Sequence, residues 1–139
     1  MAREQALVDP ARRMLHHISL GVRDLQRSAA FYDAVLSALG YVRVWADHKA
    51  VGYGHAGGQD ELAIKISVKG LVAPGAGFHL ALVAPTREAV AAFHRTALEH
   101  GGRDNGVPGL RPNYGPNYYS AFVVDPDGYR IEAVINDPL

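Results

Sequence analysis

Residues 15–22 read LHHISLGV and residues 78–83 read FHLALV, and these two stretches decide the fold. In each of them apolar residues alternate with small or polar ones, which is the pattern of a strand with one buried face. A histidine stands at the matching place in both, His17 and His79, with an offset of 62 residues (79 − 17). An ungapped internal repeat of this kind predicts two copies of one structural unit.

The residues after each of these strands predict a helix. Asp24 and Thr86 are suited to cap the helix N-termini, because their side-chain oxygens accept hydrogen bonds from unpaired backbone N–H groups. Apolar residues then follow at helical spacing to about Leu39 in the first copy and about His100 in the second. The offset of 62 also separates two further pairs of landmarks: Phe31 and Phe93, and Gly40 and Gly102.

Short strands are expected after both helices. They span about 41–46, 50–55 and 62–68 in the first copy, and 118–124 and 129–135 in the second. The run Asp125-Pro126-Asp127-Gly128 predicts a tight turn between the last two strands. Residues 101–116 contain five glycines and three prolines and are expected to form a long loop over a site.

Length and composition restrict the classes of function. The chain has 139 residues, about one domain, and its 14 basic and 14 acidic residues give a net charge of zero. We therefore expect neither nucleic acid nor a membrane as a partner. Cysteine is absent, which excludes disulfides and thiolate chemistry. Residues 1–13 lack the apolar core of a signal peptide, so we expect them to form an N-terminal arm of a cytoplasmic protein.

His17, His79 and Glu132 are the candidate metal ligands. Side chains alternate along a strand, so each histidine is expected to point away from the helix-facing side, and Glu132 does the same between Ile131 and Ala133. Two imidazoles and one carboxylate can hold a divalent ion and leave coordination positions open for a substrate. The alternative is that both histidines are polar fillers of a half-exposed sheet; their recurrence in the repeat favours the metal site.

The chain resembles the vicinal oxygen chelate superfamily, also called the glyoxalase, bleomycin-resistance and dioxygenase family. The resemblance covers about residues 14–137, and the domain is taken as 14–139. It implies an α+β fold of two tandem βαβββ modules, about 14–70 and 76–137, forming a cupped, barrel-like mixed sheet with the helices outside. The runs that carry it are HISL at 17–20, VRDL at 22–25, FY at 31–32, LGY at 39–41, FHLA at 78–81 and DPDGYRIE at 125–132.

The resemblance implies a divalent metal, such as Fe, Mn, Zn or Ni, at His17, His79 and Glu132. The small-molecule substrate would bind it through vicinal oxygens, in dioxygenase, lyase, isomerase or transferase chemistry. A homodimer is expected, because many members share the site between subunits. Lactoylglutathione lyases carry a second Glu in the first module, whereas the counterpart of Glu132 falls here at Ala63 or Ile64, which favours the dioxygenase or transferase branches.

Two other functions remain open, and six other residues are candidates for the site. A metal-free protein that binds a small molecule or an antibiotic is the main alternative, and a partner-binding module is the weaker one. Tyr114 is a candidate to orient substrate or move a proton, and His55 to shuttle a proton from a glycine-rich turn, although simple exposure is favoured for His55. The candidate substrate-binding residues are Trp45, Arg111, Asn113 and Tyr119. Surface solubility is an equal alternative for Arg111, and core packing for Tyr119.

Overall fold

The structure, a computed structural model, describes residues 12–67, 69–70 and 73–138. Most of the expected N-terminal arm, residues 1–11, therefore lies outside the described residues. The first module comprises β1 (Ile18–Val22), α1 (Leu25–Ala38), β2 (Val42–Ala46), β3 (Ala50–Gly54) and β4 (Asp60–Ile66). The second comprises β5 (Leu80–Val83), α2 (Arg87–Glu99), β6 (Arg103–Leu110), the short 3₁₀ helix η1 (Pro112–Tyr114), β7 (Tyr119–Val124) and β8 (Arg130–Ile135).

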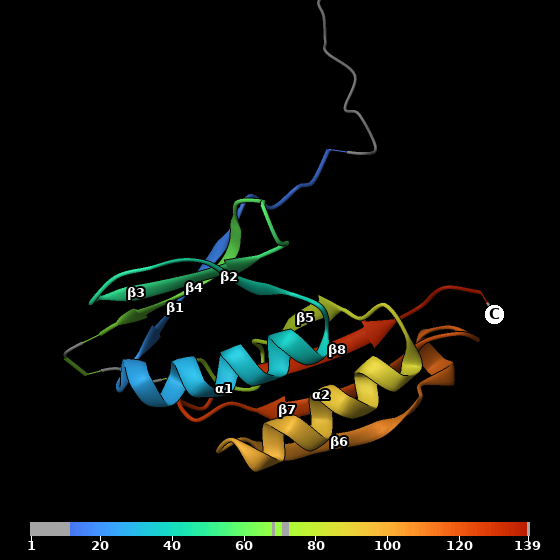
Figure 1. Ribbon diagram of the computed structural model, residues 1–139. Helices are drawn as coiled ribbons and strands as arrows, with labels where there is room; N and C mark the ends of the chain where they lie inside the picture. The colour runs from blue at the N-terminus through green and yellow to red at the C-terminus, as the bar shows by residue number, and fades with distance from the viewer. Residues whose placement is uncertain (1–11, 68, 71–72, 139) are drawn as a thin grey trace, which may run out of the picture.

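Each module forms its own four-stranded mixed sheet. The strand orders are β1-β4-β3-β2 and β5-β8-β7-β6, with β1 parallel to β4 and β5 parallel to β8. Figure 1 shows one sheet above the other, with α1 and α2 side by side and α2 in front of β6 and β7. The expected α+β fold of two βαβββ modules is confirmed. The sheets are cupped but do not close into a barrel.

The helix caps lie where the sequence predicts them. The Asp24 carboxylate accepts a hydrogen bond from the backbone N–H of Arg27 at 3.1 Å, and the Thr86 hydroxyl oxygen accepts one from that of Ala89 at 3.0 Å. Gly40 and Gly101 follow the two helices with φ values of 94° and 95°, a conformation that glycine adopts without strain.

The prediction of a loop over 101–116 is wrong for the first half of this range, because Arg103–Leu110 form the edge strand β6 beside β7. Its register shifts at Gly106 and again before Gly109, so the strand is bulged. The sequence pattern did not predict this strand, because it contains glycine and proline and its apolar residues do not alternate regularly.

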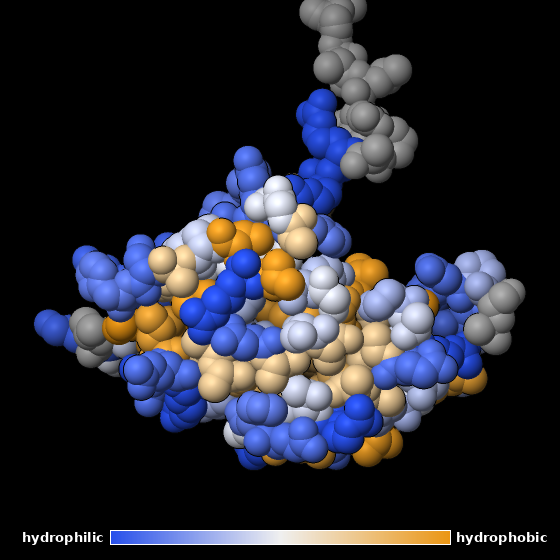
Figure 2. All heavy atoms as spheres, viewed as in Figure 1, coloured by the Kyte–Doolittle hydropathy of each residue, from blue (hydrophilic) through white to orange (hydrophobic). Residues whose placement is uncertain are grey.

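One hydrophobic core joins the two modules. Phe31 of α1 and Phe93 of α2 are fully buried, as their equivalence in the repeat predicts. Figure 2 shows pale-orange, weakly hydrophobic surface in the middle of this view, over the helices, and hydrophilic side chains along most of the rim. Polar contacts between modules add to the core: the Tyr32 hydroxyl on α1 donates a 2.5 Å hydrogen bond to Asp125 in the turn between β7 and β8.

Tyr32 is expected to make the protein sensitive to alkali. Burial, followed by the negative charge of Asp125, raises the pKa of this phenol well above 10. The unfolded chain therefore releases this proton near pH 10, while the folded chain retains it. The contribution of Tyr32 to the free energy of unfolding is fully present below pH 10 and is lost progressively as the pH rises further. Tyr32→Phe should reduce the slope of unfolding free energy against pH above 10 by about 1.4 kcal/mol per pH unit.

Urea unfolding of the wild type and of Tyr32→Phe at several values between pH 8.5 and 11 measures this slope. An equal slope in the two proteins would show that Tyr32 does not hold its proton in the folded state.

Candidate functional site

His79 and Glu132 lie together on the face of the second sheet that points away from α2. His79 directly precedes β5, and its Nε2 is 3.1 Å from Oε1 of Glu132 on β8. Glu132 is only 1% exposed, whereas the His79 side chain is 53% exposed. When two ligand atoms bind one divalent ion with bonds of about 2.1 Å and an angle of about 90° at the ion, the two atoms lie about 3 Å apart. The spacing of His79 and Glu132 therefore fits two ligands of one metal site.

Tyr118 restrains the buried carboxylate from the other side. Its hydroxyl donates a 2.6 Å hydrogen bond to Oε2 of Glu132. Burial, and then this hydrogen bond, raise the pKa of Tyr118 to about 12, while the positive charge of Arg111 acts in the opposite direction. The phenol therefore stays protonated at neutral pH and remains a donor to Glu132.

His17 does not join His79 and Glu132 within one chain. It is exposed just before β1, and its Nδ1 contacts Nδ1 of the neighbouring His16 at 2.8 Å. Among the described residues there is no group of three or more His, Cys, Asp or Glu side chains that could hold a metal ion. A single chain thus brings together two of the three predicted ligands.

The strand register identifies the counterpart of Glu132 in the first module. Glu132 pairs with Ala81, two residues after His79, and Ala63 pairs with Ser19, two residues after His17. Ala63 therefore occupies the position of Glu132, one of the two positions that the sequence indicated. The first module offers a histidine and no second carboxylate at the equivalent place.

Tyr114 and Arg111 also belong to the surroundings of the His79–Glu132 pair. Tyr114 lies in η1, is mostly exposed, and packs edge-on against Tyr118 with 5.3 Å between ring centroids. The Arg111 guanidinium carbon lies 5.4 Å from the centre of the Phe122 ring. Phe122 in turn lies 6.3 Å from the His79 ring.

The other predicted site residues lie elsewhere. Tyr119 packs toward the core on the helix side of β7, with Arg87 over its ring, because successive strand residues face opposite ways. Trp45 is part of β2, and Asn113 is exposed in η1. His55 follows β3, with its Nε2 3.8 Å from Glu61 in the first module.

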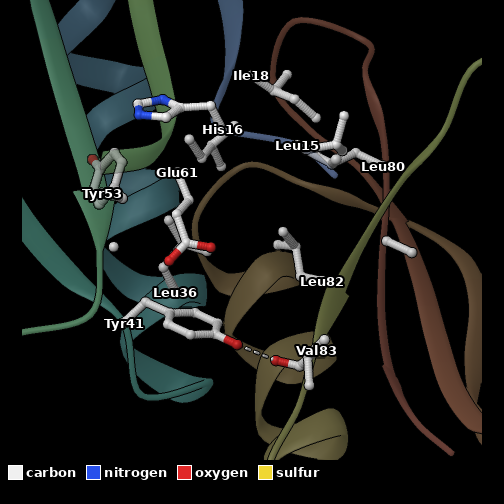
Figure 3. A pocket seen from close by; sticks show the side chains of 13 residues that line it. Leu15, His16, Ile18, Leu36, Tyr41, Tyr53, Glu61, Leu80, Leu82 and Val83 are labelled. Atoms are coloured by element: carbon white, nitrogen blue, oxygen red, sulfur yellow. Dashed lines mark hydrogen bonds between the residues drawn. The ribbon is translucent and has the colours of Figure 1, made fainter. Parts of the chain in front are cut away.

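A separate cavity of about 200 Å³ lies between the modules. Its lining is mainly apolar and comes from the start of β1, from α1 and from the edge strand β5. Figure 3 shows Glu61 pointing into it, beside Tyr41, whose hydroxyl donates a 2.7 Å hydrogen bond to the carbonyl of Val83. Neither His79 nor Glu132 lines this cavity, so it is distinct from the candidate metal ligands.

Sequence reasoning missed Tyr118 and Phe122 as neighbours of Glu132. The signal for both was available in strand alternation, since Tyr118, Ser120 and Phe122 share the face opposite to Tyr119. Phe122 is the register partner of Glu132, which places the two side chains next to each other.

Proteins of known structure resemble the chain over most of its length. A sequence model of the Glyoxalase/Bleomycin resistance protein/Dioxygenase superfamily matches residues 14–133. A glyoxalase/bleomycin resistance protein from Albidiferax ferrireducens is 32% identical, with a TM-score of 0.73 over 88% of this chain and 98% of that one. A glyoxalase-related enzyme from Fulvimarina pelagi is 22% identical, with a TM-score of 0.69 over 90% and 89% of the chains.

A longer protein resembles the chain more distantly. A glyoxalase I variant from Zea mays is 23% identical, with a TM-score of 0.63 over 86% of this chain and 45% of that longer one. No curated protein matches the sequence significantly. In the part of the chain that the structure describes, neither helix has the length and apolar character required to cross a membrane.

Proposed function

The chain belongs to the Glyoxalase/Bleomycin resistance protein/Dioxygenase superfamily, also called the vicinal oxygen chelate superfamily, and we propose that it is a divalent-metal-dependent enzyme acting on a small oxygen-rich substrate. The proposed site takes His79 and Glu132 from one copy of the chain and His17 from a second copy. The observation that carries the proposal is the 3.1 Å contact between His79 Nε2 and the buried Oε1 of Glu132. A carboxylate with 1% exposure, held beside an accessible imidazole, is an arrangement that a divalent ion would stabilise.

A homodimer explains why the three ligands are divided between the modules. His17 stands exposed at the place in the first module that His79 occupies in the second. The strands that follow these histidines, β1 and β5, are each the outermost strand of their sheet. Outer strands of this kind are commonly covered by another part of a protein or by a second subunit. A twofold dimer that set β1 of one copy beside β5 of the other would complete two identical sites.

The chain's own residues would bind the ion and orient the substrate. An ion such as Fe, Mn, Zn or Ni, when bound, would supply Lewis-acid polarisation of a substrate oxygen. Tyr118 holds Oε2 of Glu132 and leaves Oε1 beside His79, which keeps the carboxylate in one orientation. The exposed phenol of Tyr114, packed against Tyr118, is available to donate a hydrogen bond or a proton from its Oη to a substrate oxygen.

Mixed dimers test both the ligands and the sharing of the site. His17→Ala and His79→Ala should each abolish stoichiometric binding of Mn²⁺, Zn²⁺ or Ni²⁺ in calorimetry. A dimer of one His17→Ala chain and one His79→Ala chain would retain one complete site, because the intact His17 and His79 then meet across the interface. Random mixing of the two variants should therefore restore about a quarter of the wild-type sites.

Three results would decide against parts of this proposal. Failure of the wild type to bind metal would remove the metal site itself. Metal binding that survives in His79→Ala would exclude this ligand set. Binding lost in both variants but not restored in the mixture would place the site within one chain. His48→Ala, which removes an exposed histidine from the turn between β2 and β3, is the matched control and should bind as the wild type does.

The second candidate function is metal-free binding of a small molecule, as in a resistance protein of the same fold. The cavity of about 200 Å³ between the modules favours it, because its lining is mainly apolar. Ligand binding that is unaffected by a chelator and by His79→Ala would support this function over the metal-dependent one.

A further inference from the structure

Arg111 is held in a fixed position beside the candidate metal ligands. It follows β6 and is half-buried, with its guanidinium carbon 5.4 Å from the centre of the Phe122 ring. Its Nη2 donates a 2.6 Å hydrogen bond to the carbonyl of Val107. The aromatic contact and this hydrogen bond restrict the guanidinium before any ligand is bound, which lowers the entropy that binding would cost.

Two glycines of β6 provide the space for this guanidinium. A Cβ at Gly106 would lie 3.3 Å from Arg111 Nη2, and a Cβ at Gly109 would lie 3.2 Å from Nη1. The register of β6 against β7 shifts between these two glycines. The bulged strand that sequence analysis expected to be a loop thus opens a recess for the arginine.

The recess faces the candidate metal site. Phe122, under the guanidinium, is the register partner of Glu132 and lies 6.3 Å from the His79 ring. A molecule bound at His79 and Glu132 and extending over Phe122 would therefore reach Arg111.

Within the part of the chain that the structure describes, Arg111 lacks the carboxylate partner that several other arginines have. In the ranges 12–67, 69–70 and 73–138 no aspartate or glutamate forms an ion pair with it, and the one hydrogen bond of its side chain within those ranges is to Val107. By contrast, four arginines of the described residues form such pairs: Arg13 with Glu61, Arg23 and Arg27 with Asp127, and Arg43 with Asp33. Arg111 keeps most of its five N–H donors for a group outside the chain.

We propose that Arg111 binds an oxyanion, a carboxylate or a phosphate-type group, on the substrate whose oxygens occupy the site at His79 and Glu132. The binding of an oxyanion is inferred from the surroundings of Arg111 alone. The position of the substrate oxygens at His79 and Glu132 rests on the proposed function. The planar fork of a guanidinium matches either oxyanion through two parallel hydrogen bonds. The substrate is thus an anionic molecule with an oxygen-rich end and an acidic end.

The anion subsite is tested first without metal. Benzoate, phenylphosphonate and the neutral benzyl alcohol are titrated into chelator-treated protein, and the Nε–H resonance of Arg111 is followed by ¹⁵N NMR. One or both anions should shift it saturably and the alcohol should not, and whichever anion binds more tightly identifies the acidic group. Arg111→Gln should weaken anion binding about tenfold or more, and Arg111→Lys should weaken it less.

Metal-loaded protein then tests the connection to the metal site, with catechol and 3,4-dihydroxybenzoate as probes that differ by one carboxylate. The carboxylate should strengthen binding about tenfold in the wild type and have no such effect in Arg111→Gln, while catechol binds both proteins equally. Arg95→Gln, on the exposed face of α2, is the matched control, and thermal unfolding confirms that each variant is folded.

The two arms separate the possible failures. Equal anion binding by the wild type and Arg111→Gln overturns the inference, whether or not the protein binds metal. Anion binding that needs Arg111, in a protein that binds neither metal nor catechol, supports the subsite and contradicts the metal-dependent function. An equal effect of the carboxylate in both metal-loaded proteins shows that Arg111 does not serve the substrate at this site.

Discussion

Asp127→Ala is expected to lower the free energy of unfolding by about 3 kcal/mol. The Asp127 carboxylate is fully buried and accepts hydrogen bonds from the Ser28 hydroxyl at 2.7 Å and the Arg23 backbone N–H at 3.0 Å. It also pairs with the half-exposed guanidinium groups of Arg23 and Arg27 at 3.2 Å. Removing the carboxylate leaves the buried Ser28 hydroxyl and this backbone N–H without their acceptor. A fall in melting temperature of about 10 °C should accompany the change.

Asp24→Ala is the matched control, because it removes another aspartate from the same end of α1. Asp24 is exposed and caps the helix through one hydrogen bond, so its loss should cost only about 1 kcal/mol. Chemical unfolding of the three proteins measures the difference. Equal losses in the two variants would mean that the buried contacts of Asp127 stabilise the fold no more than one exposed helix cap does.

The run DPDG therefore has a structural role beyond that of a turn. Asp125 contacts Tyr32, and Asp127 contacts the start of α1, so both aspartates attach the turn between β7 and β8 to the first module. Within the turn, Asp125 also accepts hydrogen bonds from the backbone N–H groups of Asp127 and Tyr129. Glu132 lies on β8 only a few residues after this turn. The contacts that join the modules thus also fix the strand that carries the candidate ligand.

Sequence patterns predicted the elements whose signals are local. The ends of β1 and β5 follow from alternation, although the strands begin at Ile18 and Leu80, two or three residues later than the pattern predicts. The limits of α1 and α2 follow from their caps and from helical spacing. The face of Glu132 follows from its neighbours, since Ile131 and Ala133 pack in the core. Each of these features depends on residues within a few positions of one another.

Features that depend on distant residues were not predictable in this way. The strand β6 is stabilised by pairing with β7 and not by its own sequence, which is rich in glycine. Alternation alone puts Tyr118 and Tyr119 on opposite faces of this strand, but which of the two meets Glu132 depends on the register of β7 against β8, and a shift of one residue exchanges the two faces. The separation of His17 from the other two ligands is a property of how the modules pack, which no local pattern encodes.

Glu132→Gln is expected to weaken binding of Mn²⁺, Zn²⁺ or Ni²⁺ by at least about 100-fold, because the amide removes the negative charge from the proposed ligand. The two side chains have nearly the same shape, and the amide oxygen can still accept the hydrogen bond of Tyr118, so the fold should be retained. Tyr118→Phe leaves the ligand in place but removes its restraint, and should weaken binding by about tenfold. Calorimetric titration of chelator-treated protein measures both effects.

Tyr119→Phe is the control that makes this series specific, since it removes the same hydroxyl from the next residue, on the opposite face of β7. Its metal affinity should equal that of the wild type. The expected loss of metal affinity is therefore large for Glu132→Gln, smaller for Tyr118→Phe and absent for Tyr119→Phe. Equal affinities for the two tyrosine variants would remove Tyr118 from the site, and unchanged binding by Glu132→Gln would mean that any bound ion lies elsewhere in the molecule. The graded result alone requires that Glu132 bind the ion and that Tyr118 act through Glu132.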